Sequence, residues 1–224
     1  MKTIRSSILC LVVLLLFVPL LRAQDLSKYR HFTLGMNLTK LLERTGQKMT
    51  DVKMIHGRPA LIQELIWWPP NVPGTSVRSE NVEQLLFSFY NGELYKISVT
   101  YDRSSTEGLT EADMVKSISA KYGPATIVPP EIDLATSEGY STKQKPVATW
   151  EDAEYSFSLV RSSFGDDLGL VAFSKRANAQ AEIAIVEALK LDEQEGPKRD
   201  AERQKKKMND LEVMRQKNQK TFRP

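Results

Sequence analysis

Two histidines, His31 and His56, are the first candidates for chemistry, because imidazole titrates near neutral pH. His56 belongs to the segment His56-Gly57-Arg58-Pro59, where it could bind an anion together with Arg58; a plain turn at a strand end is the alternative. The chain contains no HExxH, GxSxG, SxxK or P-loop spacing. We therefore predict no catalytic residue, no cofactor and no enzyme, and we keep an exported hydrolase with a noncontiguous active site as the alternative.

Acidic residues gather in two short clusters, residues 151–154 and Asp166-Asp167, and carboxylates are ligands that Ca²⁺ prefers. A predicted strand of roughly 10 residues separates the clusters and corresponds to about 30 Å of extended chain. Neither cluster alone matches the EF-hand loop. We interpret both as solvated turns and predict no metal site.

Two adjacent tryptophans, Trp67 and Trp68, lie in a predicted strand, where neighbouring side chains point to opposite faces of the sheet. One of the two indoles is therefore expected on the far face. It is structural if a second layer, such as a helix over residues 177–191, covers it. If it is left exposed, it is an aromatic anchor for a partner.

Four basic residues form a compact positive cluster near the end of the chain: Arg203, Lys205, Lys206 and Lys207. The cluster could attract anionic envelope polymers, lipid headgroups or an acidic protein; a solubilising tail is the alternative. Residues 198–224 carry ten basic and four acidic groups, whereas residues 24–197 carry 18 basic and 24 acidic groups. Because the predicted body is acidic, we expect no nucleic-acid partner.

The first 23 residues are typical of a secretory signal peptide. Lys2 and Arg5 precede the apolar run 8–21, and the small residue Ala23 precedes Gln24. The run is shorter than the roughly 20 residues of a membrane span and contains Pro19. We predict cleavage near Ala23-Gln24, an exported periplasmic or secreted protein, and no stable transmembrane segment afterwards; an uncleaved anchor is the alternative.

Cleavage would also remove Cys10, the one cysteine of the chain. The remaining protein could form no disulfide and would have no thiolate nucleophile. Its stability must therefore come from the packing of its own core.

The rest of the chain predicts helices and strands in a recurring order. A helix over residues 37–46, with Asn37 as N-cap and Gly46 as its end, precedes strands and a hairpin. A second helix, from Thr110 to Gly123, precedes a similar set. The expected strands are residues 51–56, 60–68, 83–90, 93–101, 125–128, 146–150, 155–164 and 168–174, and the expected polar loops are residues 69–81 and 129–145. We interpret this order as an internal duplication; two unrelated α+β segments are the alternative.

The hairpin at Asn91-Gly92 allows a prediction of register. A two-residue turn would pair Phe87 with Lys96 and mix apolar with polar side chains. A three-residue loop, Tyr90-Asn91-Gly92, would instead pair Phe87 with Tyr95 and Leu85 with Ile97. We predict the three-residue loop, because it keeps the aromatic row on one face.

An alanine-rich helix is expected over residues 177–191, with one buried side made of Ala181, Ile185, Ala188 and Leu189. Gly196-Pro197 is expected to break this helix. The apolar residues of the remaining tail are too sparse for a coiled coil, so we expect either a frayed, solvated helix or disorder.

Residues 32–46 (FTLGMNLTKLLERTG) and 86–95 (LFSFYNGELY) resemble the SmpA/OmlA-type domain of the outer-membrane assembly factor BamE. A tandem pair of such units is similar to the β-lactamase inhibitor protein. The resemblance covers about half of the chain and implies an exported α/β module that binds other proteins. This chain lacks the lipidated cysteine that anchors BamE, and the resemblance implies no functional residue.

These observations predict an α+β protein: an antiparallel sheet with helices packed on one face, in two similar helix-plus-four-strand halves, followed by a helical tail. The expected parts are residues 1–23, 24–104, 105–176, 177–196 and 197–224. We expect a non-enzymatic binding or scaffold protein that acts on another protein or an anionic envelope component. The candidate binding residues are Trp67, Trp68, His56, Arg58, Arg203, Lys205, Lys206 and Lys207.

Overall fold

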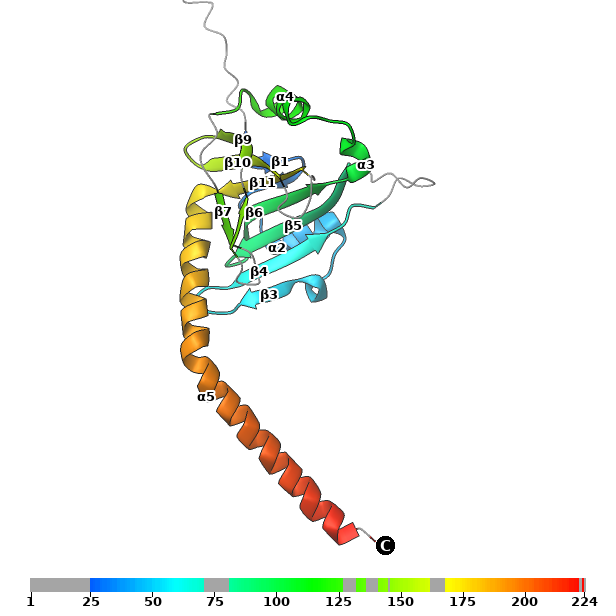
Figure 1. Cartoon of the computed structure of the whole chain (residues 1–224), viewed down its shortest axis with the longest axis vertical. Helices are drawn as coiled ribbons and strands as arrows, with labels where there is room; N and C mark the ends of the chain where they lie inside the picture. The colour runs from blue at the N-terminus through cyan, green and yellow to red at the C-terminus, as the bar shows by residue number, and fades with distance from the viewer. Residues whose placement is uncertain are drawn as a thin grey trace, which may run out of the picture.

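A seven-stranded antiparallel sheet forms the centre of the computed structural model (Figure 1). The structure describes residues 25–70, 81–126, 132–135, 141–144, 146–161, 168–221 and 223. The strand order is β3-β4-β5-β6-β11-β10-β9. The predicted α+β class is confirmed. The strands are β3 (Lys53–His56), β4 (Ile62–Trp67), β5 (Val82–Tyr90), β6 (Glu93–Tyr101), β9 (Pro146–Glu151), β10 (Tyr155–Arg161) and β11 (Leu168–Ser174).

The two halves of the chain meet where β6 pairs with β11. In each half the strands follow one another from an edge of the sheet to this central pair. An isolated bridge between Thr126 and Thr149 adds a short segment outside β9, in the position that β3 occupies beside β4. This arrangement matches the order expected for two similar halves, and their origin by duplication stays a prediction.

Helices α2 (Leu38–Thr45) and α4 (Glu111–Tyr122) end where the sequence predicts. The Asn37 side chain accepts a hydrogen bond from the Thr39 amide, and Gly46 takes the left-handed conformation that ends α2. At the start of α4, Thr110 and Asp113 form a reciprocal capping box. The shorter elements are β1 (Lys28–Tyr29), β2 (Phe32–Thr33), the 3-10 helix Met49–Asp51 and α3 (Arg103–Thr106).

Helices α2 and α4 pack against the same core. Their apolar stripes, which include Leu41 of α2 and Ile118 of α4, join a buried cluster with Phe87, Phe157 and Trp150 of the sheet. The Trp150 indole donates a hydrogen bond of 2.8 Å to the carbonyl of Gly123, directly after α4. The indole therefore ties the end of this helix to β9.

The predicted register of the β5–β6 hairpin is wrong. Asn91 and Gly92 both have positive φ and form a two-residue turn between Tyr90 and Glu93. A β-bulge at Tyr95 then shifts the register, so that Phe87 lies opposite Ile97 and not Tyr95. The bulge keeps Ile97 in the main core while placing Tyr95 on the opposite face of the sheet, and it reconciles the favoured Asn-Gly turn with a continuous apolar face. The second predicted pair, Leu85 with Ile97, is wrong for the same reason. Leu85 lies opposite Val99.

Helix α5 (Lys175–Thr221) covers part of the face of the sheet on which Tyr95 lies, opposite the main core. Its buried side includes Ala181, Ala184 and Ala188, and Ala181 packs with Ile62 and Tyr95. The predicted buried side is partly wrong, since Leu189 is 43% exposed. Figure 1 shows α5 lying along the sheet from β11 towards β3 before it leaves the body.

The predicted break at Gly196-Pro197 is also wrong, because α5 continues through Pro197 to Thr221. Figure 1 shows a change of direction partway along the helix. A proline inside a helix removes one backbone hydrogen bond and crowds the preceding turn, which bends the helix without necessarily ending it. Of the two alternatives for the tail, the structure contains the solvated helix.

Several further expectations change or lie outside the described residues. Residues 129–145, expected as a polar loop, contain a two-stranded hairpin of β7 (Ile132–Ala135) and β8 (Ser141–Gln144). The predicted signal peptide, most of the loop 69–81 and the end of the expected strand 125–128 lie outside the described residues. The end of the expected strand 155–164 and the acidic pair Asp166-Asp167 also lie outside them. Among the helices that are described, none has the length and apolar character needed to cross a membrane.

Gly169 tests the pairing between the two halves. A Cβ atom at this position would lie 2.8 Å from the backbone oxygen of Val99 on β6, too close for an unshifted strand pair. We expect Gly169→Ala to lower the free energy of unfolding by about 1–3 kcal/mol, measured by urea denaturation. Gly57→Ala is the matched control, since its Cβ would meet only the Met54 sulfur at 3.6 Å. Equal stability of the two variants would contradict the tight β6–β11 contact.

Candidate functional site

The turn that contains His56 and Arg58 contacts α5 beside its proline. The Arg58 guanidinium forms an ion pair with Glu195, and Arg199 bonds Asp192 at 2.8 Å. Arg199 is the main cause of the lowered pKa of Asp192; His56 and Arg58 add smaller contributions. The predicted anion-binding pair is therefore placed against carboxylates of this chain, where it links the β3–β4 turn to the helix.

The two adjacent tryptophans have different environments. Trp67 is 8% exposed and packs edge-on against Phe32, with ring centroids 5.7 Å apart. Trp68 is 53% exposed, and Ile66, two residues earlier, is 39% exposed. Helix α5 packs near Ile62, at the other end of β4, so the expected second layer exists without burying Trp68.

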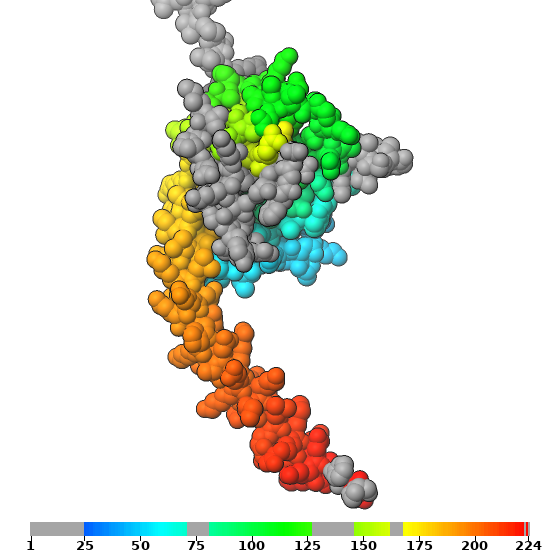
Figure 2. Space-filling model, viewed as in Figure 1, coloured from blue at the N-terminus to red at the C-terminus, as the bar shows by residue number. Residues whose placement is uncertain are grey.

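The basic cluster lies on the part of α5 that projects from the body (Figure 2). Residues 201–221 are all exposed. Within the described part of the chain, no ion pair engages Arg203, Lys205, Lys206 or Lys207. Their positive charges are therefore available to a partner.

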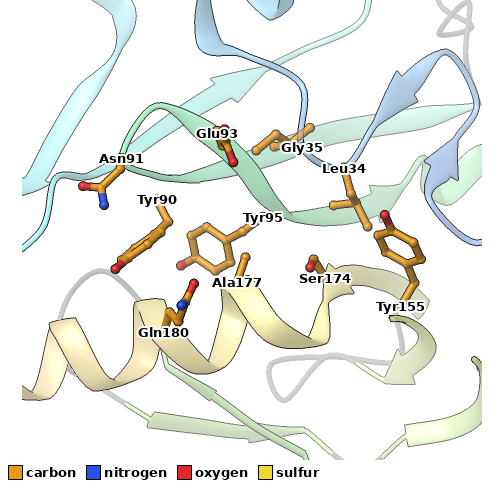
Figure 3. Close-up of a pocket in the computed structure, with 11 residues that line it drawn as sticks. Leu34, Gly35, Tyr90, Asn91, Glu93, Tyr95, Tyr155, Ser174, Ala177 and Gln180 are labelled. Carbon is orange, nitrogen blue, oxygen red and sulfur yellow. The ribbon is translucent and has the colours of Figure 1, made fainter. Parts of the chain in front are cut away.

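A pocket of about 320 Å³ lies between the β5–β6 hairpin and the first turns of α5 (Figure 3). We call it the tyrosine pocket, because Tyr90, Tyr95 and Tyr155 line it. Figure 3 shows Tyr90 and Tyr95 at one end and Tyr155 at the other. The other lining residues are Leu34, Gly35, Asn91, Glu93, Leu94, Ser174, Ala177 and Gln180.

Backbone hydrogen bonds hold the walls of the tyrosine pocket in place. The Gly35 amide donates to the Leu94 carbonyl at 2.7 Å, and the Leu94 amide donates to the Met36 carbonyl at 2.9 Å. The Asn91 side chain accepts from the Leu61 amide at 3.0 Å. These bonds join the chain before α2, the hairpin turn and the start of β4, and they fix these walls of the pocket relative to one another.

Two of the three pocket tyrosines have a raised pKa. Burial raises the pKa of Tyr95, and the carboxylates of Glu64 and Glu182 raise it further. Burial is also the main cause of the raised pKa of Tyr155. These two residues therefore offer ring faces and neutral hydroxyl groups to a ligand near pH 7.

Neither histidine lines the tyrosine pocket. His31 is exposed and its ring contacts Phe32, whereas His56 is half-buried at the end of β3. Among the described residues, no group of three or more His, Cys, Asp or Glu side chains is placed to hold a metal ion. The carboxylate of Asp152, from the first acidic cluster, accepts two backbone hydrogen bonds of 2.7 Å in the β9–β10 turn.

The pocket itself could not be found from the sequence. Its residues come from the chain before α2, the hairpin, the start of β10, the end of β11 and the first part of α5. The one local signal was the Asn-Gly turn. The decisive feature is the bulge at Tyr95, which turns this side chain towards α5.

Comparison with known proteins gives no family for this chain. No family model and no curated protein match it. Among solved structures, a cysteine-rich secretory protein from Staphylococcus aureus aligns with 64% of this chain at 11% identity and a TM-score of 0.34. The aligned part spans 44% of that protein. A similarity of this degree supports no conclusion about function.

The two tryptophans provide a matched pair for mutation. Trp67→Ala should lower the free energy of unfolding by about 3–5 kcal/mol, because it leaves a cavity in the core. Trp68→Ala should change it by less than about 1 kcal/mol, because much of that indole is already in solvent. Thermal or urea denaturation of both variants measures the difference. Similar losses would show that Trp68 is covered in the folded protein.

Proposed function

We propose that this protein is an exported, non-enzymatic binding protein that attaches to an anionic envelope component through the projecting part of α5. The observation that carries the proposal is the exposed helix 201–221, whose residues Arg203, Lys205, Lys206 and Lys207 form no ion pair with any other residue that the structure describes. The resemblance of two segments to exported binding modules supports the same class of function.

The distribution of charge on the helix favours an extended anionic partner. Successive residues of an α-helix are about 100° apart, so Arg203, Lys206 and Lys207 lie on one side of the helix within an arc of about 100°, and Lys205 points away from them. A layer of lipid headgroups can contact the three residues on the shared side. A flexible acidic polymer can contact these three and also reach Lys205.

The body and the tail carry net charges of opposite sign, which favours a tail that projects away from the body. Residues 24–197 carry six more acidic than basic groups, whereas residues 198–224 carry six more basic than acidic groups. Along the helix, Arg203 lies about 8 Å from Lys198, roughly one Debye length at physiological salt, and Lys220 lies about 33 Å from it. The tail can therefore contact an anionic surface while salt screens much of the repulsion between that surface and the acidic body.

Binding to lipid vesicles tests this proposal. The purified protein should co-sediment with vesicles that contain acidic phospholipid, and binding should weaken as salt rises. The combined variant R203Q, K205Q, K206Q and K207Q should bind at least about tenfold more weakly, since each basic group near the surface contributes about 1 kcal/mol. The same binding measurement is made with a soluble acidic polysaccharide in place of the vesicles. Binding to the polysaccharide would identify a polymer partner.

The matched control removes four exposed lysines from elsewhere: K40Q, K53Q, K116Q and K190Q. This variant has the same net charge as the tail variant and should retain binding. Equal loss in both variants would show that net charge alone matters. Absence of binding to both vesicles and polymer would contradict the proposed partner.

A protein partner is the second candidate, and the exposed Trp68 beside Ile66 favours it. Crosslinking in the native envelope fraction separates the two candidates. Partners that persist without residues 198–224 and disappear in Trp68→Ala would place the binding surface on the sheet.

A further inference from the structure

We propose that the tyrosine pocket binds a small organic cation, with an alkylammonium group held between Tyr90, Tyr95 and Glu93. This site is separate from the basic part of α5 and does not depend on the function proposed for it. Three features of the pocket lead to this ligand class: its aromatic walls, its charge and its size.

The aromatic walls supply the main attraction. The faces of tyrosine rings carry partial negative charge and attract cations, and several rings together form the cages that recognise quaternary ammonium groups. Figure 3 shows the Tyr90 and Tyr95 rings close together above α5, with Tyr155 across the pocket beside Leu34. The ammonium group would contact the first two rings, and the alkyl part would extend towards Tyr155.

The charge of the lining selects a cation over an anion. Among the described residues of the lining, Glu93 at the start of β6 is the one that carries a charge. Glu64 and Glu182 lie close enough to raise the pKa of Tyr95. The Lys96 ammonium lies 5.7 Å from the Tyr95 ring centroid, and Lys175, which follows the lining residue Ser174, forms an ion pair with Glu151. The groups to count around Tyr95 are therefore Glu93, Glu64, Glu182 and Lys96. These four groups together carry two net negative charges.

The Lys96 ammonium, which lies over the Tyr95 ring, shows that this ring already attracts a cation. The lysine is buried, and burial lowers the pKa of its ammonium group while Glu64 and Glu182 oppose that effect. Lys96 does not line the pocket, so its ammonium does not occupy the space assigned to the ligand. The two carboxylates offset its charge, and Glu93 is left to balance the ligand.

The size of the pocket limits the ligand to a small molecule. A volume of about 320 Å³ is at the lower end of the range of about 300–1,000 Å³ for ligand pockets. Ser174 and Gln180, at the α5 side, can bond a hydroxyl or carbonyl group on the same ligand. A quaternary or primary ammonium with a short polar chain fits these constraints.

Choline and its neutral isostere 3,3-dimethyl-1-butanol test the proposal directly, because they have nearly the same shape and differ in charge. Binding to the full chain is measured by isothermal titration calorimetry and by NMR shifts of the tyrosine side chains. Choline should bind, and the neutral alcohol should bind at least about fivefold more weakly.

Three variants assign the binding to this pocket. Glu93→Gln and Tyr90→Leu should each weaken choline binding about fivefold or more, whereas Tyr90→Phe should retain most of it because the ring face remains. Glu83→Gln, on the same hairpin and also exposed, is the matched control and should bind as the unmodified protein does. Circular dichroism confirms that each variant is folded.

Three outcomes would overturn the proposal. The first is equal binding of choline and the neutral alcohol, which would show that the pocket recognises shape without charge. The second is choline binding that persists in folded Glu93→Gln and Tyr90→Leu variants, and the third is no choline binding at all. Vesicle binding by the basic tail is measured separately, so none of these outcomes affects that result.

Discussion

The pairing of β6 with β11 is the contact on which the rest of the structure depends. Each half of the chain brings strands to one side of this pair, and neither half buries both edges of its own sheet. Residue 169 is a glycine, and a Cβ at this position would lie 2.8 Å from the Val99 backbone oxygen on β6. The buried cluster then continues across the pair, from Phe87 and Ile97 to Ala172 and Phe157. Without a disulfide in the described region, this shared core holds the two halves together.

Helix α5 reinforces the same junction from the other face. Its first residue, Lys175, forms an ion pair with Glu151 at 2.9 Å, and Glu195 near its bend pairs with Arg58. The helix is thus attached to both halves of the sheet, with its alanine side against Ile62 and Tyr95. Exposed ion pairs contribute little energy alone, so the apolar contact holds the helix and the ion pairs fix its direction. The direction of α5 determines where its first turns line the tyrosine pocket and where its basic tail projects from the body.

Local patterns predicted the elements well, and contacts between distant residues explain what they missed. Caps at Asn37 and Thr110 and the glycines after both helices determine helix ends through neighbouring atoms alone. The hairpin register failed because a bulge at Tyr95 satisfies both the Asn-Gly turn and the apolar face, and its stability depends on α5. Pro197 was expected to end a helix that it bends. Of the candidate site residues, Trp67 proved to be core, whereas the tyrosine pocket exists only after folding.

Amide hydrogen exchange is the most direct test of the central claim that one sheet joins the two halves into a single cooperative unit. Amides of β6 and β11 should exchange only through global unfolding, at one common free energy of opening that β5 and β10 share. A lower free energy of opening for residues 146–174 than for residues 82–101 would contradict the claim, because it would show that the second half unfolds while the first remains folded.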